Sequence, residues 1–238
     1  PERGSMSSSH DKHPRLAELE QMVRDGRIDT IIVAFTDMQG RLMGKRVQAE
    51  AFLAGVIDHG AHFCTYLLGT DMEMNTPDGF ALMNWESGYG DWIADPLWDT
   101  MRVVPWLEKT AIVLSDTVDH HGHEIPVSPR TILKKVVAKA TGMGFSVMAG
   151  SEFEYYLLTD TYEQAYEKGF VGLERFGKYN EDYHLLQATK AEPIHGKLRN
   201  LMTEAGIPVE FSKGEAAPGQ HEVNIHYTDV LTMSDQSV

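Results

Sequence analysis

Four glutamates in two short segments carry the strongest chemical signal in this sequence. Glu152 and Glu154 lie in the apolar and aromatic segment 149–158, and Glu215 and Glu222 lie in the segment 213–222. The surrounding residues are typical of a buried strand, where carboxylates are rare unless a partner neutralises them. A hard divalent cation is the simplest such partner, so the pattern predicts a metal site.

Strand geometry predicts how these side chains are grouped. Because side chains alternate between the faces of a strand, Glu152 and Glu154 share one face, about 7 Å apart at the backbone. Pro218-Gly219 predicts a turn that can direct Glu215 toward Glu222. If the segments are neighbours, three or four carboxylates converge, and all-oxygen ligation suits Mg²⁺ or Mn²⁺. The alternative is a set of edge-strand acids that face solvent. The residues predicted on the opposite, core face are Phe145, Val147, Ala149, Phe153, Tyr155 and Leu157.

The composition narrows the class of protein. The chain has 238 residues, of which 42% are hydrophobic, so a sizeable core is possible. A net charge of −14 gives no general attraction for nucleic acid or anionic membrane. Cys64 is the single cysteine, and no apolar run approaches the ~20 residues of a membrane span. These features favour a cytoplasmic protein.

The elements that must position the glutamates form two groups, which meet near residue 117. Apolar residues at helical spacing from Leu16 predict a helix that Gly26 ends. The segments 28–36 and 41–47 predict a hairpin around the turn 37–40. A short helix over 49–55, a long loop over 69–90 and a strand over 111–115 are also expected.

The second group begins with the clearest helix signal, an N-cap serine and a first-turn proline at Ser128-Pro129. The buried stripe predicted for this helix is Ile132, Leu133, Val136, Val137 and Ala140. The elements predicted after it are a strand over 145–158, a loop over 160–183, a helix over 193–205, strands over 208–212 and 220–227, and a helix from residue 231. The class is therefore α+β. We interpret residues 1–13 as a cloning remnant and disordered tail, 14–117 as one domain and 118–238 as a second.

Two further patterns have competing interpretations. The segment 119–123 contains three histidines around Gly122, which favours a hairpin turn over a metal site. Four tryptophans, at positions 85, 92, 98 and 106, either anchor an irregular segment or line a site or subunit contact.

The glutamate segments resemble the two metal motifs of the glutamine synthetase family. The motifs are Gly150-Ser151-Glu152-Phe153-Glu154-Tyr155-Tyr156-Leu157 and Gly214-Glu215-Ala216-Ala217-Pro218-Gly219-Gln220-His221-Glu222. Upstream, residues 90–106 resemble the end of the family's N-terminal domain, and the hairpin over 28–47 fits that domain. The resemblance covers residues 16–238 and looks closer to the ligases that use amines. It implies a β-grasp N-terminal domain followed by the first part of the catalytic α+β domain.

The resemblance also implies roles for individual residues. Glu154, Glu215 and Glu222 match the ligands of the metal near the acyl substrate, and Glu152 matches a ligand of the metal shared with the nucleotide phosphates. The residues that match nucleotide contacts are Glu210, Ile225, His226 and Tyr227. Tyr183 matches a tyrosine near the glutamate site, and Asp78 matches the aspartate that binds and deprotonates ammonium.

The chemistry implied by the resemblance is a two-step, ATP-dependent ligation. The γ-carboxylate of glutamate attacks ATP to give an acyl phosphate, and ammonia or an amine then displaces phosphate. Bound Mg²⁺ or Mn²⁺ would neutralise the phosphoryl oxygens and invert the field of this acidic chain. A homo-oligomeric ring is implied as well.

The family's second half has no counterpart here. That half would supply the remaining ligands of the second metal and the arginines that hold glutamate and phosphate. We therefore expect an incomplete part of a longer ligase, inactive on its own. The alternatives are a non-catalytic, metal-binding structural relative and a metal-dependent hydrolase that needs no ATP.

Overall fold

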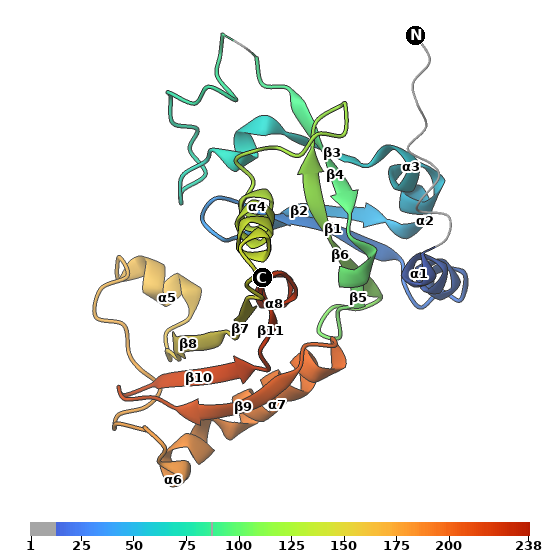
Figure 1. The fold of residues 1–238 in the computed structure, drawn as a ribbon. Coiled ribbons are helices and arrows are strands. Elements are labelled where there is room, and N and C mark those ends of the chain that lie inside the picture. The colour runs from blue at the N-terminus through green and yellow to red at the C-terminus, as the bar shows by residue number, and fades with distance from the viewer. Residues whose placement is uncertain (1–12, 87) are drawn as a thin grey trace. The chain divides into compact units, whose positions relative to one another are not determined.

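The computed structural model describes residues 13–86 and 88–238 and divides into two compact units (Figure 1). Unit 1 runs to Val147 and includes Ser234–Val238, whereas unit 2 is Met148–Met233. Of the predicted tail, residues 1–12 lie outside the described residues, and His13 caps the first helix by accepting a hydrogen bond from the Arg15 amide. The domain division at 117/118 stays a prediction.

Unit 1 is built on a mixed sheet with the strand order β2-β1-β6-β4-β3, and β5 also pairs with β6. The pairs are antiparallel except for β1 and β6, which run parallel. The predicted hairpin is confirmed as β1 and β2, and the predicted strand over 111–115 is part of β6. The strands are β1 (Thr30–Thr36), β2 (Leu42–Gln48), β3 (Ala61–Cys64), β4 (Asp91–Pro96), β5 (Arg102–Val103) and β6 (Thr110–Val118).

Aromatic side chains fill the core of unit 1. Trp92 is fully buried, stacks on Phe63 with ring centroids 4.8 Å apart, and meets the edge of Phe35 at 4.6 Å. Trp98 is buried as well, so two of the four tryptophans anchor the fold, while Trp85 and Trp106 are exposed. The helical elements are α1 (Pro14–Arg24), α2 (Ala49–Ala51), the π-helix η2 (Phe52–Val56), α3 (Ile57–His59), the 3₁₀ turns η3 (Thr65–Leu68) and η4 (Trp98–Thr100), and α4 (Pro129–Gly142).

Helix α4 begins at Pro129 as predicted, but its predicted apolar stripe is not buried. Ile132 and Val136 are 43% and 58% exposed. The helix is instead held by charge: Arg130 contacts Asp116 at 2.6 Å and Asp235 at 2.8 Å. An apolar stripe is buried only where another element covers it, and spacing alone cannot supply that element.

The histidine-rich segment forms the predicted turn. Gly122 has a φ of +81°, a conformation that favours glycine. The Asp119 carboxylate accepts hydrogen bonds from the His121 and His123 amides at 2.8 and 2.9 Å.

Unit 2 contains the three-stranded antiparallel sheet β8-β10-β9, with α7 packed against β9 (Figure 1). A small apolar cluster of Ala205, Ile207 and Ile225, with Phe153 and Val209 against it, joins α7 to one face of this sheet. The predicted helix over 193–205 and both predicted strands are confirmed, with Gly206 at a φ of +79° after the helix. The elements are β7 (Met148–Ala149), β8 (Glu152–Tyr156), α5 (Tyr162–Glu167), α6 (Leu185–Ala188), the 3₁₀ turn η5 (Thr189–Ala191), α7 (Glu192–Glu204), β9 (Val209–Gly214), β10 (Gln220–Ile225), β11 (Thr228–Asp229) and α8 (Val230–Ser237).

The predicted single strand over 145–158 is wrong in its extent. The chain leaves the extended ladder at Gly150-Ser151, so β7 pairs with β11 and β8 pairs with β10. Phe145 and Val147 precede β7 and are exposed rather than in the core. Alternation does hold within β8, where Phe153 and Tyr155 are half-buried and the glutamates are exposed. Short strands that pair with different partners cannot be told from one long strand by composition alone.

Candidate active site

The register of the unit 2 sheet places charged residues in a row across three strands. Glu154 of β8 lies opposite Glu222 of β10, which lies opposite Lys213 of β9. One step along, Glu152 lies opposite Asn224. Residues in register on neighbouring strands project to the same face. The sheet therefore brings Glu154 and Glu222 to one surface, on the side away from the α7 cluster.

Glu215 joins this row through the turn between β9 and β10. Its amide donates to the Gln220 carbonyl at 2.9 Å, and Gly219 supplies the left-handed conformation, with a φ of +76°. A hydrogen bond between the two carboxyl groups lowers the pKa of Glu215 and raises that of Glu222. Glu222 is 4% exposed, and its burial adds to the upward shift of its pKa. Two acids this close share one proton unless a cation lies between them.

Lys213 supplies a cation at this point. Its Nζ contacts Glu215, lies 3.4 Å from a Glu222 oxygen, and lies 3.2 Å from Asp182. Burial lowers the pKa of Lys213, but hydrogen bonds to Glu215 and Asp182 outweigh that effect and raise the pKa overall. Sequence reasoning missed Lys213, although its position two residues before Glu215 on a strand places it beside the acids.

The outer glutamates are more open. Glu154 is exposed and accepts a hydrogen bond from Gln220 Nε2 at 2.9 Å. Glu152 is exposed as well. Within residues 13–86 and 88–238, no three His, Cys, Asp or Glu side chains are grouped so that they could hold a metal ion. In this arrangement the Lys213 ammonium group contacts oxygens of both Glu215 and Glu222.

The donor set nevertheless fits a hard divalent cation. Glu154, Glu215 and Glu222 offer only carboxylate oxygens, which Mg²⁺ and Mn²⁺ prefer. Glu222 is a buried acid that already has a positively charged group beside it. The assignment of these residues as ligands stays a prediction.

The two predicted substrate residues fall in different units. Tyr183 has a φ of +55°, and its ring covers Lys213 Nζ at 4.4 Å from the centroid, so it adjoins the acidic row. Asp78 is exposed in the long loop of unit 1 between η3 and β4.

The four predicted nucleotide contacts gather where β10 ends. The ladder register shifts between Asn224 and Ile225, which leaves Glu210 as the additional residue of a bulge. Glu210 Oε1 lies 3.3 Å from His226 Nδ1, and His226 and Tyr227 are in ring contact at 4.9 Å. Ile225 is buried in the core, so only its backbone can meet a ligand.

A buried polar cluster lies behind the acidic row, and sequence reasoning missed it. His195 and His221 are buried with ring centroids 4.3 Å apart, and His221 Nε2 lies 3.7 Å from Glu181. The ring of Tyr155 lies 5.9 Å from that of His195. Burial, followed by the charge of His221, lowers the pKa of His195 to about 4. The available signal is a histidine at a core-facing position of a strand, because His221 alternates with the buried residues Val223 and Ile225.

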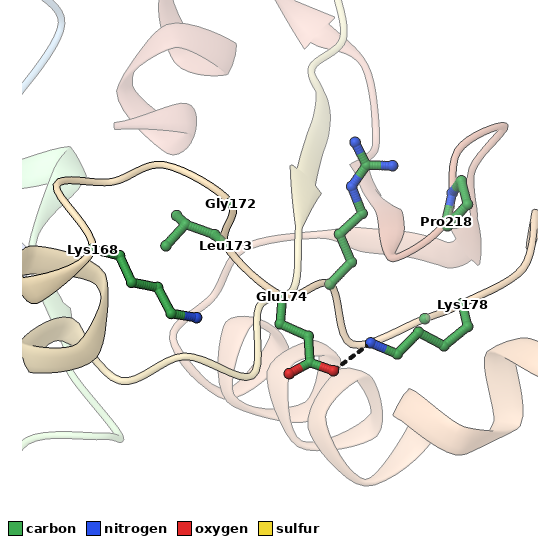
Figure 2. A pocket seen from close by; sticks show the side chains of 8 residues that line it. Lys168, Gly172, Leu173, Glu174, Lys178 and Pro218 are labelled. Atoms are coloured by element: carbon green, nitrogen blue, oxygen red, sulfur yellow. Dashed lines mark hydrogen bonds and ion pairs between the residues drawn. The ribbon is translucent and has the colours of Figure 1, made fainter.

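Two pockets open on unit 2. One of about 200 Å³ is lined by Tyr183, Lys213, His195 and neighbouring residues of α6 and β9, beside the acidic row. The other, of about 640 Å³, is lined by residues of the loop 172–178 together with Lys168 and Pro218, and its two lysines are already paired. Figure 2 shows Lys178 joined to Glu174 at its rim, and Lys168 contacts Asp160.

Comparison with known proteins identifies the class. The sequence pattern of the glutamine synthetase catalytic domain matches residues 126–238, a segment that contains all four glutamates. The gamma-glutamylethanolamide synthetase GlnA4 of Streptomyces coelicolor is 42% identical over 230 residues, covering 95% of this chain and 49% of that protein. The glutamate–isopropylamine ligase of a Pseudomonas species is 33% identical, covering 97% of this chain and 50% of that protein.

The chain belongs to the glutamine synthetase family. It spans about half the length of the curated relatives that it matches. The solved GmaS/ADP complex shares the fold with a TM-score of 0.71 at 22% identity, over 92% of this chain and 46% of that one. The fold is thus a mixed α+β fold of the glutamine synthetase type. No helix within the described ranges 13–86 and 88–238 is long and apolar enough to cross a membrane.

Proposed function

We propose that this chain is part of an ATP-dependent ligase that joins ammonia or an amine to the γ-carboxylate of glutamate. The observation that carries the proposal is that the β8-β10-β9 sheet places Glu154 beside Glu222, with Glu215 brought to the same row by the turn after β9. The names of two relatives support it, because one makes a glutamyl-ethanolamide and the other ligates isopropylamine.

The proposed roles follow the geometry. Glu154, Glu215 and Glu222 hold one metal ion, Mg²⁺ or Mn²⁺, and Glu152, two residues along the same face, contributes to a second. When bound, these ions neutralise charge on the phosphoryl group. The proposed nucleotide contacts are Glu210, Ile225, His226 and Tyr227. Tyr183 is proposed to contact the glutamate substrate, and Asp78 to bind and deprotonate the amine.

The reaction is an acyl-phosphate ligation. A γ-carboxylate oxygen of glutamate bonds to the γ-phosphorus of ATP, and the bond to ADP breaks. The amine nitrogen then bonds to the acyl carbon, loses a proton and displaces inorganic phosphate. A carboxylate-rich face needs bound cations to accept two anionic substrates, and that requirement agrees with the net charge of −14.

The finer architectural features are also proposals. Residues 14–117 form a β-grasp domain, and 118–238 form the first part of the catalytic domain. The complete protein is a cytoplasmic homo-oligomeric ring. A parallel pair within a mixed sheet in unit 1, formed by β1 and β6, supports the β-grasp assignment.

The test is ATP-dependent phosphate release by the complete polypeptide that contains this chain. Release should require glutamate together with an acceptor, screened as ammonia, ethanolamine and isopropylamine, and the 238-residue chain alone should show no turnover. Glu154→Gln should weaken Mn²⁺ binding by about 10- to 100-fold, because a charged ligand is lost. Glu167→Gln, on helix α5, is the matched control and should change nothing.

The outcomes separate the candidate functions. Mn²⁺ binding without phosphate release would indicate a non-catalytic relative, and hydrolysis that needs no ATP would indicate a hydrolase. Unchanged Mn²⁺ affinity in the Glu154→Gln variant would refute the metal assignment.

A further inference from the structure

The ammonium group of Lys213 has two sets of partners, and only one of these sets consists of proposed metal ligands. One set is the acid pair Glu215 and Glu222, which the proposed function assigns to a metal ion. The other set is Asp182, at 3.2 Å, and the ring of Tyr183, at 4.4 Å. An ammonium group over an aromatic face gains a cation–π attraction in addition to the ion pair. The Lys213 ammonium group therefore keeps favourable partners if a metal ion binds Glu215 and Glu222.

The position of Lys213 is fixed by the sheet rather than by a flexible loop. Its Cα lies in register with that of Glu222, and its side chain is 17% exposed. The ammonium group and a divalent ion cannot occupy the space between Glu215 and Glu222 together, because both need the same carboxylate oxygens and their charges repel.

We propose that Lys213 is an internal counter-ion that competes with the divalent metal for Glu215 and Glu222. This inference rests on the metal assignment of the proposed function. When the metal binds, the Lys213 ammonium moves onto Asp182 and Tyr183. Metal binding is thereby coupled to the segment 182–183, which carries the proposed glutamate contact. In the metal-free protein the lysine keeps two close acids from repelling each other.

The apparent metal affinity equals the intrinsic affinity of the free site multiplied by the fraction of molecules in which Lys213 does not occupy that site. If Lys213 occupies the acid pair in about nine molecules of ten, its removal tightens metal binding about tenfold. A lysine with a purely structural role would predict weaker binding after its removal, so the direction of the change is diagnostic.

The experiment is a calorimetric titration of Mn²⁺ into the full-length protein and its variants. Lys213→Met removes the charge and keeps the length, and should lower the Kd for Mn²⁺ about tenfold. Lys213→Gln is a second neutral variant, in case the first is poorly folded, and should act in the same direction. Lys213→Arg keeps the charge and should stay within about twofold of the parent.

The matched control is Lys178→Met. Lys178 also pairs with a glutamate of unit 2, at 2.6 Å, but that residue, Glu174, is not a proposed ligand (Figure 2). Its replacement should leave the Kd for Mn²⁺ unchanged.

Two failures are distinguishable. If the parent binds no Mn²⁺, the metal assignment itself is wrong. If the parent binds Mn²⁺ and both neutral Lys213 variants bind no more tightly, only the competition by Lys213 is refuted.

Discussion

At the scale of single residues, neighbouring side chains of strand β10 in unit 2 lie in two different electrostatic environments. Glu222 faces the acidic row, and the residue before it on the strand, His221, faces the buried cluster behind the sheet. Alternation of side chains thus separates an ionised face from a neutral one within a single strand. The acids need a cation, whereas the buried imidazoles must stay neutral because burial disfavours their charged form.

The neutral state of His195 predicts how stability depends on pH. Its pKa is about 4 in the folded chain, against an ordinary value of 6.5, so the unfolded state binds a proton first as the pH falls. This histidine therefore contributes stability above pH 6.5 that is lost progressively down to pH 4. Between pH 7.5 and 5.0 the loss from His195 should be about 2 kcal/mol of unfolding free energy.

Urea unfolding of the parent and of His195→Gln at both pH values measures this loss. The variant cannot gain the proton, so its stability should fall less steeply with pH. His184→Gln is the control, because His184 is exposed and its replacement should leave the parent's pH slope intact. Equal slopes for the parent and His195→Gln would contradict the prediction.

At the scale of elements, β9 is packed closely against the segment that carries Tyr183. A methyl group on Gly214 would lie 2.4 Å from the Glu181 carbonyl oxygen and 2.7 Å from its Cβ. Gly214→Ala should therefore cost about 2 kcal/mol of unfolding free energy, because the backbone of one segment must shift.

The control for this substitution is Gly142→Ala at the end of α4, where no atom lies within 4 Å of the added Cβ. That change should be neutral or slightly stabilising, since alanine is the better helix former. If Gly214→Ala lowers the unfolding free energy no more than Gly142→Ala does, the segment that contains Glu181 can shift at little cost, and the prediction is wrong.

The elements that sequence predicted correctly are those with local signals. Helix α7 ends before Gly206, and the β9–β10 turn follows Pro218-Gly219, as local rules require. Strands β3 and β4 were missed because β3 is only four residues long and β4 ends in Asp95-Pro96. The stripe of α4 was wrong because burial depends on what covers a helix.

The difference between local signals and long-range contacts also explains which parts of the candidate site the sequence predicted. Spacing placed Glu152 and Glu154 on one face, and the structure agrees. The register that sets Lys213 opposite Glu222 depends on how β9 and β10 pair, which a single sequence does not state. The contacts of Lys213 with Asp182 and Tyr183 join residues thirty and more positions apart, and no local pattern reports them.

At the scale of the whole molecule, the two units differ in how they are stabilised. Unit 1 has a large apolar core that includes Trp92, Phe35 and Phe52. The apolar cluster of unit 2 has three buried members, Ala205, Ile207 and Ile225, and the unit also buries the polar residues Glu181, His195 and His221. Apolar burial is the main favourable term in folding, so unit 2 should open more readily than unit 1.

Native-state hydrogen exchange tests this difference. Amides of β1 and β6 should exchange slowest, and those of β8 and β10 faster, because opening of unit 2 exposes less apolar surface. Mn²⁺ at about 100 times its Kd should add about 2.7 kcal/mol of protection to β8 and β10, since the metal binds only the folded site. Mn²⁺ should leave the exchange rates of the β1 and β6 amides unchanged if unit 1 opens independently of β8 and β10. Uniform protection across both units would mean that they unfold together, and no protection in β8 and β10 would mean that the acidic row does not bind the ion.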